Sequence, residues 1–202
     1  MYNLPYFKAD NEQQVIDFMN QNPFIVLAGC DADSKPVATH IPIMVMKRDD
    51  KIFLQGHIMR NTDHHRAFEN NRHVLAIFTG PHAYVSASWY ADAKQASTWN
   101  YVTVHAKGML TFKDETFLLN LLKQTTAHFE NNPSSPSLVE HLSEEYVHKL
   151  MKAIVAFEIE VDNLDHVFKL SQNKDEATHK NVVEQLSIGD DSAKAVAAMM
   201  TS

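Results

Sequence analysis

Hydrophobic and polar residues alternate along much of the chain in a way that predicts an antiparallel barrel with helices outside it. Runs of apolar and β-branched residues bounded by turn residues are typical of strands. We expect strands over Phe24 to Cys30, Pro36 to Arg48, Lys51 to His57, His73 to Thr79, His82 to Ser88, Thr98 to Phe112 and Ala153 to Asp162. Helical segments never alternate one for one with these strands, so the pattern argues against a doubly wound parallel sheet.

Two turns and one strand carry the detail of this prediction. Asp49-Asp50 is expected to form a hairpin turn, and Gly80-Pro81 is expected to turn the chain between two strands. The last strand alternates along AIVAFEIEVD, which indicates one buried and one solvent-facing side. The side chains expected to point inward are Val155, Phe157, Ile159 and Val161, and those expected outward are Glu158, Glu160 and Asp162.

Helical spacing of apolar residues marks the remaining elements. Asp10 with Gln13 resembles a capping box for a helix that ends before Pro23. A short helical pattern covers residues 61–70, and two longer helices are expected to begin at Asp114 and Ser143.

These elements suggest one main domain. From Asn163 onward the chain looks helical. We therefore expect a barrel domain over residues 1–162, with inserted helices at about 114–151, and a helical extension over residues 163–202 that packs on the barrel.

The composition narrows the functional classes. The chain has 202 residues, of which 45% are hydrophobic, so it can bury a sizeable core. Its net charge of -7 argues against a broad nucleic-acid surface, because phosphate binding needs clustered Lys and Arg. The single Cys30 excludes an internal disulfide, and neither a signal sequence nor a membrane-span run is evident, so we expect a cytoplasmic protein. The twelve histidines follow no metal-ligand spacing, and we expect no metal site.

Two strands flanking the segment from Ser86 to Tyr101 share an uncharged aromatic face. Neither residues 79–91 nor residues 98–106 contain Lys, Arg, Asp or Glu, which a face meant for water usually carries. Such a face fits a second subunit or a flat polar ligand, but Trp and Tyr in strands are also typical of the core, and both interpretations stay open on this segment alone. The face consists of His82, Tyr84, Ser86 and Ser88 on one strand and Trp99, Tyr101, Thr103 and His105 on the other.

A second segment, GHIMRNTDHHR, concentrates basic residues in an otherwise acidic protein. His57, Arg60 and Arg66 fall within it, and Asn61 and Thr62 supply neutral donors at the entry to a helix. Such a cluster suits a phosphate, because free backbone N–H groups at a helix start add to the side chains. The alternative is a solvated basic helix face. An anion cradle and an uncharged aromatic face together match the two ends of flavin mononucleotide (FMN).

Five segments, taken in order along the chain, resemble one known family. They are ATHIPI (Ala38 to Ile43), QGH (Gln55 to His57), GPHAYVSASWY (Gly80 to Tyr90), TWNYVTVHAKG (Thr98 to Gly108) and KLSQNK (Lys169 to Lys174). They are similar to those of the PaiB-like family, FMN-binding split-barrel proteins that are described as negative transcriptional regulators. The resemblance implies a six-stranded antiparallel split barrel, like that of pyridoxamine-phosphate oxidase and the flavin reductases, which forms a homodimer with FMN at the subunit interface.

The resemblance also implies positions for the cofactor. It places Thr39 and His40 where backbone and side chain can meet the ring system. It places five residues on the shelf that closes over the ring or seals the dimer: Ser88, Trp89, Trp99, Asn100 and Tyr101.

One stretch departs from the family pattern, which has an Asn-Pro pair and then a Trp before a basic residue. The matching positions here hold Thr62, Asp63, His65 and Arg66. A carboxylate within about 5 Å of a phosphate costs on the order of 1 kcal/mol when little water lies between them. We therefore expect Asp63 to weaken FMN binding unless the neighbouring arginines compensate.

The sequence leaves several functions open. The leading expectation is an FMN-binding homodimer that acts in regulation or as a flavin-dependent oxidoreductase of low activity, with no residue expected in covalent catalysis. The alternatives are a haem-handling protein on the same scaffold, with a histidine as axial ligand, and an interaction protein without a cofactor. No helix-turn-helix pattern stands out, and the charge gives little support for direct DNA binding.

Overall fold

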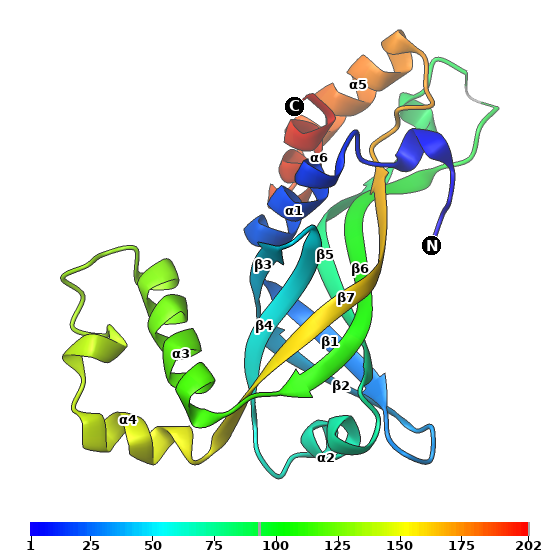
Figure 1. Cartoon of the computed structure of the whole chain (residues 1–202). Coiled ribbons are helices and arrows are strands. Elements are labelled where there is room, and N and C mark those ends of the chain that lie inside the picture. Colours follow the sequence, from blue (N-terminus) through cyan, green and yellow to red (C-terminus); the bar gives the residue numbers. More distant parts are fainter. Residues whose placement is uncertain (93, 202) are drawn as a thin grey trace. The chain divides into compact units, whose positions relative to one another are not determined.

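The computed structural model describes residues 1–92 and 94–201, and within them the chain forms seven strands (Figure 1). The strands are β1 (Phe24–Cys30), β2 (Pro36–Pro42), β3 (Met44–Arg48), β4 (Lys51–Met59), β5 (His73–Val85), β6 (Thr98–Phe112) and β7 (Ile154–Lys169). They follow the order β2-β1-β5-β6-β7-β4-β3, so the edge strands of this open sheet are β2 and β3. The pairings of β1 with β2 and β5, and of β4 with β3 and β7, are antiparallel.

Helices occupy segments before, between and after the strands. The α-helices are α1 (Glu12–Gln21), α2 (Asp63–Asn70), α3 (Glu115–Glu130), α4 (Glu144–Met151), α5 (Glu176–Ser187) and α6 (Asp191–Thr201). Short 3-10 turns are η1 (Pro5–Phe7), η2 (Ala87–Trp89) and η3 (Val139–His141). No helix in the described part of the chain combines the length and apolar character that a membrane span requires.

The chain forms two compact units, and each is described separately below. Unit 1 contains residues 1–22, 78–105 and 165–202, and unit 2 contains residues 23–77 and 106–164. The three longest strands, β5, β6 and β7, contribute residues to both units.

Several predicted elements are confirmed. The strands β1 and β6 have the predicted bounds. Asp49 and Asp50 have positive φ angles of 48° and 61°, as a two-residue type I′ hairpin turn requires. Asp114 caps α3 by accepting a hydrogen bond from Phe117 N at 2.8 Å, and Ser143 caps α4 in the same way.

The six-stranded barrel that the resemblance implies is corrected: within the described residues the structure has seven strands in a sheet that does not close, because the segment from Pro36 to Arg48 divides. Its two halves, β2 and β3, pair with β1 and β4 respectively. Between them, the Ile43 backbone N–H donates to the Pro23 carbonyl oxygen at 2.9 Å, outside the paired registers. One continuous stretch of sequence therefore supplies both edges of the sheet.

The predicted turn at Gly80-Pro81 was also wrong, because β5 runs through it without a break. A Cβ atom at Gly80 would lie 2.6 Å from Cε2 of Phe18, a core residue of α1. Glycine is therefore needed here for the close approach of a ring, and not for a turn.

Two further expectations about element ends are corrected. Residues 163–169 are extended, not helical, because β7 continues to Lys169 and buries Val167 and Phe168. The cap of α1 is Asn11, whose side chain accepts from Gln14 N at 2.9 Å, and not Asp10.

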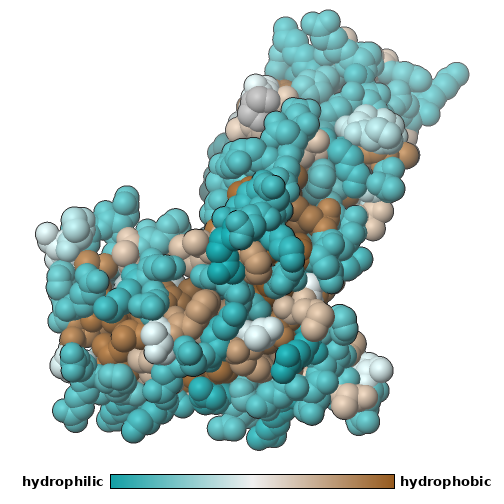
Figure 2. All heavy atoms as spheres, in the orientation of Figure 1, coloured by the Kyte–Doolittle hydropathy of each residue, from teal (hydrophilic) through white to brown (hydrophobic). Residues whose placement is uncertain are grey.

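Each unit has its own packed interior. In unit 1, α1 buries Phe18 against Phe168, with ring centroids 5.6 Å apart, and α5 packs against α6. In unit 2, α3, η3, α4 and β7 share a cluster of buried residues: Leu118, Leu121, Val139, Val147, Met151 and Ala156. Hydrophobic residues gather over α3 and α4 in Figure 2.

Candidate functional site

The uncharged aromatic face predicted from the sequence lies in unit 1 and is accessible. Along β6, Val102 and Val104 are buried, whereas Trp99, on the opposite side of the strand, is 54% exposed. Along β5, Ala83 and Val85 are buried and Tyr84 is 51% exposed. The alternation of the two strands is therefore confirmed, and the aromatic side does not face the core.

The rings on this face are close together, and we call them the aromatic shelf (His82, Tyr84, Trp99 and Tyr101). The Trp99 ring centroid lies 5.9 Å from that of Tyr84, edge to face, and 6.1 Å from that of His82. Burial raises the pKa of Tyr101, followed by the influence of Tyr2, so its hydroxyl is neutral near pH 7.

A cavity of about 370 Å³ opens beside the shelf. Among the described residues, its lining contains no Lys, Arg, Asp or Glu. The lining consists of Thr79, Gly80, His82, Trp99, Tyr101, Val102 and Thr103. Its volume lies within the range of small-molecule sites. The hydroxyl of Thr103 donates to the Phe78 carbonyl oxygen at 2.8 Å. Because its hydrogen is used in this way, the Thr103 hydroxyl can accept a hydrogen bond from a ligand but not donate one. The shelf and cavity suit a flat, uncharged ring system.

Three residues predicted on the shelf lie elsewhere in unit 1. Asn100 is fully buried and exchanges hydrogen bonds with the Ser171 hydroxyl at 2.9 and 3.2 Å. Ser88 and Trp89 fall in η2, because β5 ends at Val85 and the Ser86 side chain caps the following turn. The Trp89 carbonyl accepts from Asn181 of α5 at 2.6 Å. Of the five residues predicted there, Trp99 and Tyr101 line the cavity.

The basic segment lies in unit 2 at the start of α2. Thr62 caps this helix: its hydroxyl accepts from His65 N at 3.3 Å and donates to the Met59 carbonyl oxygen at 3.0 Å. Asn61 before it has a left-handed φ of 64°. Arg60 and Arg66 are exposed, so their guanidinium groups can reach a ligand from solvent.

Asp63, which departs from the family pattern, forms hydrogen bonds with the next residue in the chain. Its Oδ1 accepts from the His64 backbone N–H at 2.8 Å and lies 3.0 Å from the His64 ring Nδ1. These hydrogen bonds from His64 lower the pKa of the Asp63 carboxyl. The carboxylate is therefore ionised near pH 7 and directed toward His64.

The remaining predicted residues lie on strands of unit 2. Thr39 and His40 pair with Leu27 and Val26 across β1, and the exposed His40 ring stacks on Phe24 at 6.2 Å. His57 on β4 is half-buried, and burial lowers its pKa, so the imidazole is neutral near pH 7. Because α2 contacts β1 and β2, and β2 contacts β4, these residues come from neighbouring elements.

Comparison with known proteins places these features in a family. The profile of a family described as "Putative FMN-binding domain" matches residues 1–163. A relative from Bacillus subtilis (strain 168), "Protease synthase and sporulation protein PAI 2", is 36% identical over 186 residues, which cover 92% of this chain and 89% of the relative. The chain belongs to the PaiB-like, FMN-binding family. FMN is the cofactor of this family.

Solved structures share the fold of this PaiB-like chain. The FAD and haem binding protein from Mycobacterium smegmatis matches with a TM-score of 0.58 at 16% identity, over 80% of this chain and 72% of that one. The conserved hypothetical protein Rv2991 from Mycobacterium tuberculosis matches with a TM-score of 0.57 at 13% identity, over 86% and 92%. At such low identity the likeness concerns the fold alone.

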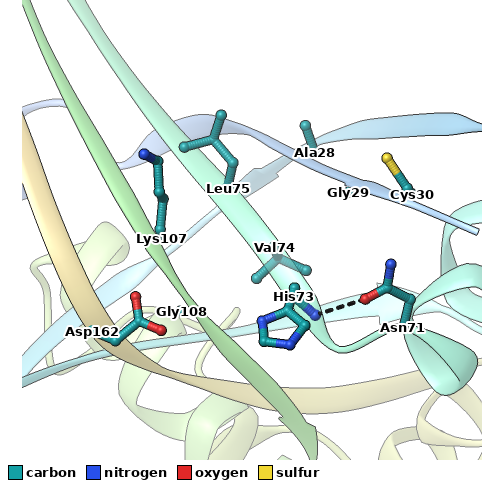
Figure 3. A pocket seen from close by; sticks show the side chains of 10 residues that line it. All are labelled: Ala28, Gly29, Cys30, Asn71, His73, Val74, Leu75, Lys107, Gly108 and Asp162. Carbon is teal, nitrogen blue, oxygen red and sulfur yellow. Dashed lines mark hydrogen bonds between the residues drawn. The ribbon is translucent and has the colours of Figure 1, made fainter. Parts of the chain in front are cut away.

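A hollow of about 530 Å³ in unit 2 of the PaiB-like chain was not predicted (Figure 3). Its walls include Ala28, Val74 and Leu75. The side chains of Cys30 and Lys107 also line it. The residues come from β1, β5, β6, β7 and the end of α2, so no local sequence pattern could have revealed it. No group of three or more His, Cys, Asp or Glu side chains within residues 1–92 and 94–201 is arranged to hold a metal ion.

Proposed function

We propose that this protein is an FMN-binding homodimer of the split-barrel type in which the aromatic shelf holds the flavin ring system. The observation that carries the proposal is the exposure of Trp99 and Tyr84 beside a cavity without charged side chains. Large exposed aromatic residues usually mark a ligand or partner surface. A flavin ring is flat and neutral, and it gains by stacking on rings and by accepting hydrogen bonds at its edge.

We propose separately, from the side chains of unit 2 alone, that its basic segment binds a phosphate such as that of FMN. Arg60 donates through Nε to the Ile154 carbonyl oxygen at 2.9 Å, which fixes the guanidinium while its terminal nitrogens stay available. Arg66 is exposed on the first turn of α2. The ionised Asp63 opposes the phosphate, so the affinity for FMN is expected to be moderate.

The proposed role combines the electron chemistry of FMN with the orienting side chains of the protein. FMN provides the electron chemistry when it is bound, and the residues of the shelf orient the ring and exclude water. The relative's name, "Protease synthase and sporulation protein PAI 2", links it to sporulation, and we propose a role in regulation for this chain. We infer that its flavin oxidoreductase activity is weak. The net charge of -7 does not support direct attraction to DNA.

The shelf is tested by titrating purified protein with FMN and following the quenching of flavin fluorescence. Trp99→Ala is expected to weaken FMN binding by about tenfold, because a buried ring-on-ring contact is lost. Tyr146→Ala is the matched control, since Tyr146 is 51% exposed on α4 and outside the shelf. Equal FMN affinities of wild type and Trp99→Ala would contradict the proposal that the flavin ring binds on the shelf. A haem absorption band in place of a flavin spectrum would favour the haem-handling alternative.

The phosphate contacts are tested with the double variant Arg60→Ala/Arg66→Ala. Loss of two charge-assisted contacts at an exposed site is expected to weaken FMN binding by roughly 30-fold. Arg72→Ala, which removes an exposed arginine beyond the end of α2, should leave the affinity unchanged. Sedimentation should give a dimer at micromolar concentration for all three proteins. A monomeric wild type would contradict the homodimer, and an unchanged affinity of the double variant would remove both arginines from the site.

A further inference from the structure

A second, polar pocket of about 230 Å³ lies in unit 1 and is separate from the shelf cavity. Alternation along β6 explains the separation: Trp99 and Tyr101 line the shelf cavity, while Thr98 and Asn100 line this pocket. The segment KLSQNK, which begins at the last residue of β7, supplies Lys169 and Lys174 to its wall. The family resemblance includes this segment, but the proposed FMN contacts do not use it.

Two ammonium groups line the pocket, and no carboxylate is found among the described residues of its wall. Lys169 Nζ donates to Thr98 Oγ1 at 2.6 Å and to the Trp99 carbonyl oxygen at 2.5 Å, which leaves one of its three N–H donors. Lys174 Nζ lies 4.3 Å above the Tyr90 ring and donates to Gln95. Burial lowers the pKa of Lys169, and the charge of Lys174 lowers it further. The two cations therefore destabilise each other until a negative charge comes between them.

The hydroxyl of Tyr90 is the independent sign of a ligand. Tyr90 is only 6% exposed and lines the pocket, and its hydroxyl has no hydrogen-bond partner in residues 1–92 or 94–201. Buried hydroxyl groups almost always have a partner, because an unpaired one costs about 1–3 kcal/mol. Burial raises the pKa of Tyr90, so this hydroxyl stays protonated and can donate.

A further hydroxyl adds to the donors. Ser97 lines the pocket, and its Oγ accepts from the Ala87 backbone N–H at 2.9 Å, so its own hydrogen can be donated. The wall thus combines a serine hydroxyl and two ammonium groups with Tyr90, whose unpaired hydroxyl is itself fully buried. A ligand that only accepts hydrogen bonds and carries negative charge complements this set, whereas a cation or an apolar group does not.

We propose that this pocket binds the oxyanion group, a phosphate or a carboxylate, of a small ligand, with Lys169, Lys174 and the Tyr90 hydroxyl as its donors. The Tyr90 hydroxyl gains the partner that the described residues do not give it, and the anion offsets the repulsion between the two lysines. The assignment stands on the side chains of unit 1 and does not depend on where FMN binds.

The experiment is a calorimetric titration of the purified full chain with inorganic phosphate. Wild type is expected to bind phosphate saturably, and Tyr90→Phe is expected to bind it about tenfold more weakly. Tyr90→Phe removes a hydroxyl that makes no hydrogen bond within the described protein, so thermal unfolding without phosphate should be unchanged or shifted upward. That second measurement separates loss of binding from loss of folding.

A pair of lysine variants controls for charge. Lys174→Met is expected to weaken phosphate binding by about tenfold, whereas Lys180→Met, at an exposed position of α5, should not change it. Absence of saturable binding of both phosphate and acetate to wild type, or equal affinities of wild type and Tyr90→Phe for the anion that binds, would overturn the proposal.

Two further arms identify the source of the oxyanion. Acetate in place of phosphate distinguishes a carboxylate ligand from a phosphate ligand, and saturable binding of either supports the site. Repeating the phosphate titration after saturation with FMN tells whether the occupant is separate from the flavin. If phosphate still binds after FMN saturation, the pocket holds a second ligand. If phosphate no longer binds, and Tyr90→Phe also weakens FMN binding, the pocket holds the phosphate of the flavin itself.

Discussion

Replacing Gly108 with alanine is expected to lower the free energy of unfolding by about 3 kcal/mol. Gly108 is buried on β6, and a Cβ atom there would lie 2.1 Å from the carbonyl oxygen of Glu160 and 2.9 Å from Cγ2 of Ile159 on β7. Backbone atoms cannot rotate away as a side chain can, so the two strands must separate locally. Urea denaturation followed by circular dichroism measures the change.

The neighbouring Met109→Ala provides the control for this prediction. Met109 is 47% exposed on the same strand, so its truncation should change the free energy of unfolding by less than about 1 kcal/mol. A Gly108→Ala protein as stable as Met109→Ala would show that β6 and β7 can move apart at little cost, contrary to the close approach described here.

Replacing Glu158 with alanine is expected to destabilise the protein by about 3 kcal/mol. Glu158 is only 8% exposed and accepts hydrogen bonds from Arg48 at 2.6 Å, Gln55 at 2.8 Å and Lys113 at 2.9 Å. The value is at the lower end for a broken buried pair, because the side chains of Arg48 and Lys113 remain 48% and 28% exposed to water. Chemical denaturation at pH 7 measures it.

The next acidic residue along β7 is the matched control. Glu160 pairs with Lys51, but the two side chains are 51% and 61% exposed, so Glu160→Ala should cost no more than about 1 kcal/mol. If both variants lost the same stability, the network around Glu158 would have no special weight.

Acid should remove the same contribution. Burial alone would raise the pKa of Glu158, but hydrogen bonds from Lys113 and Gln55 and the charges of Lys113 and Arg48 outweigh it and lower the pKa below its ordinary 4.5. Because the folded-state pKa is the lower one, the stabilisation is fully present above about pH 4.5 and is lost as the pH falls through the folded value. The stability difference between wild type and Glu158→Gln should therefore shrink below pH 4.5.

The sequence predicted the parts of the fold that depend on neighbouring residues. The bounds of β1 and β6 follow from apolar runs, and the Asp49-Asp50 turn follows from residues that tolerate positive φ. The aromatic shelf was predictable for the same reason, because alternation along a strand alone decides which side Trp99 and Tyr101 occupy.

The errors occurred where distant residues decide the outcome. Alternation assigned Glu158 to solvent, yet Arg48 and Gln55, more than a hundred residues earlier in the chain, satisfy it in the interior. Gly80 is a turn residue by composition, but Phe18 of α1 determines its place in a strand. The oxyanion pocket joins side chains from residue 7 to residue 174, and the unpaired hydroxyl of Tyr90 that marks it can be recognised only in the folded structure.

The arrangement of β3, β4 and β7 bears on how the chain is made. The hairpin of β3 and β4 closes within a few residues and can form as soon as it leaves the ribosome, whereas β7 begins at Ile154, about a hundred residues later. Until then, one side of β4 carries unpaired backbone groups beside buried residues such as Ile52 and Leu54. Nascent or truncated chains that stop before Ile154 should therefore depend on chaperones and aggregate readily, while the completed chain should not.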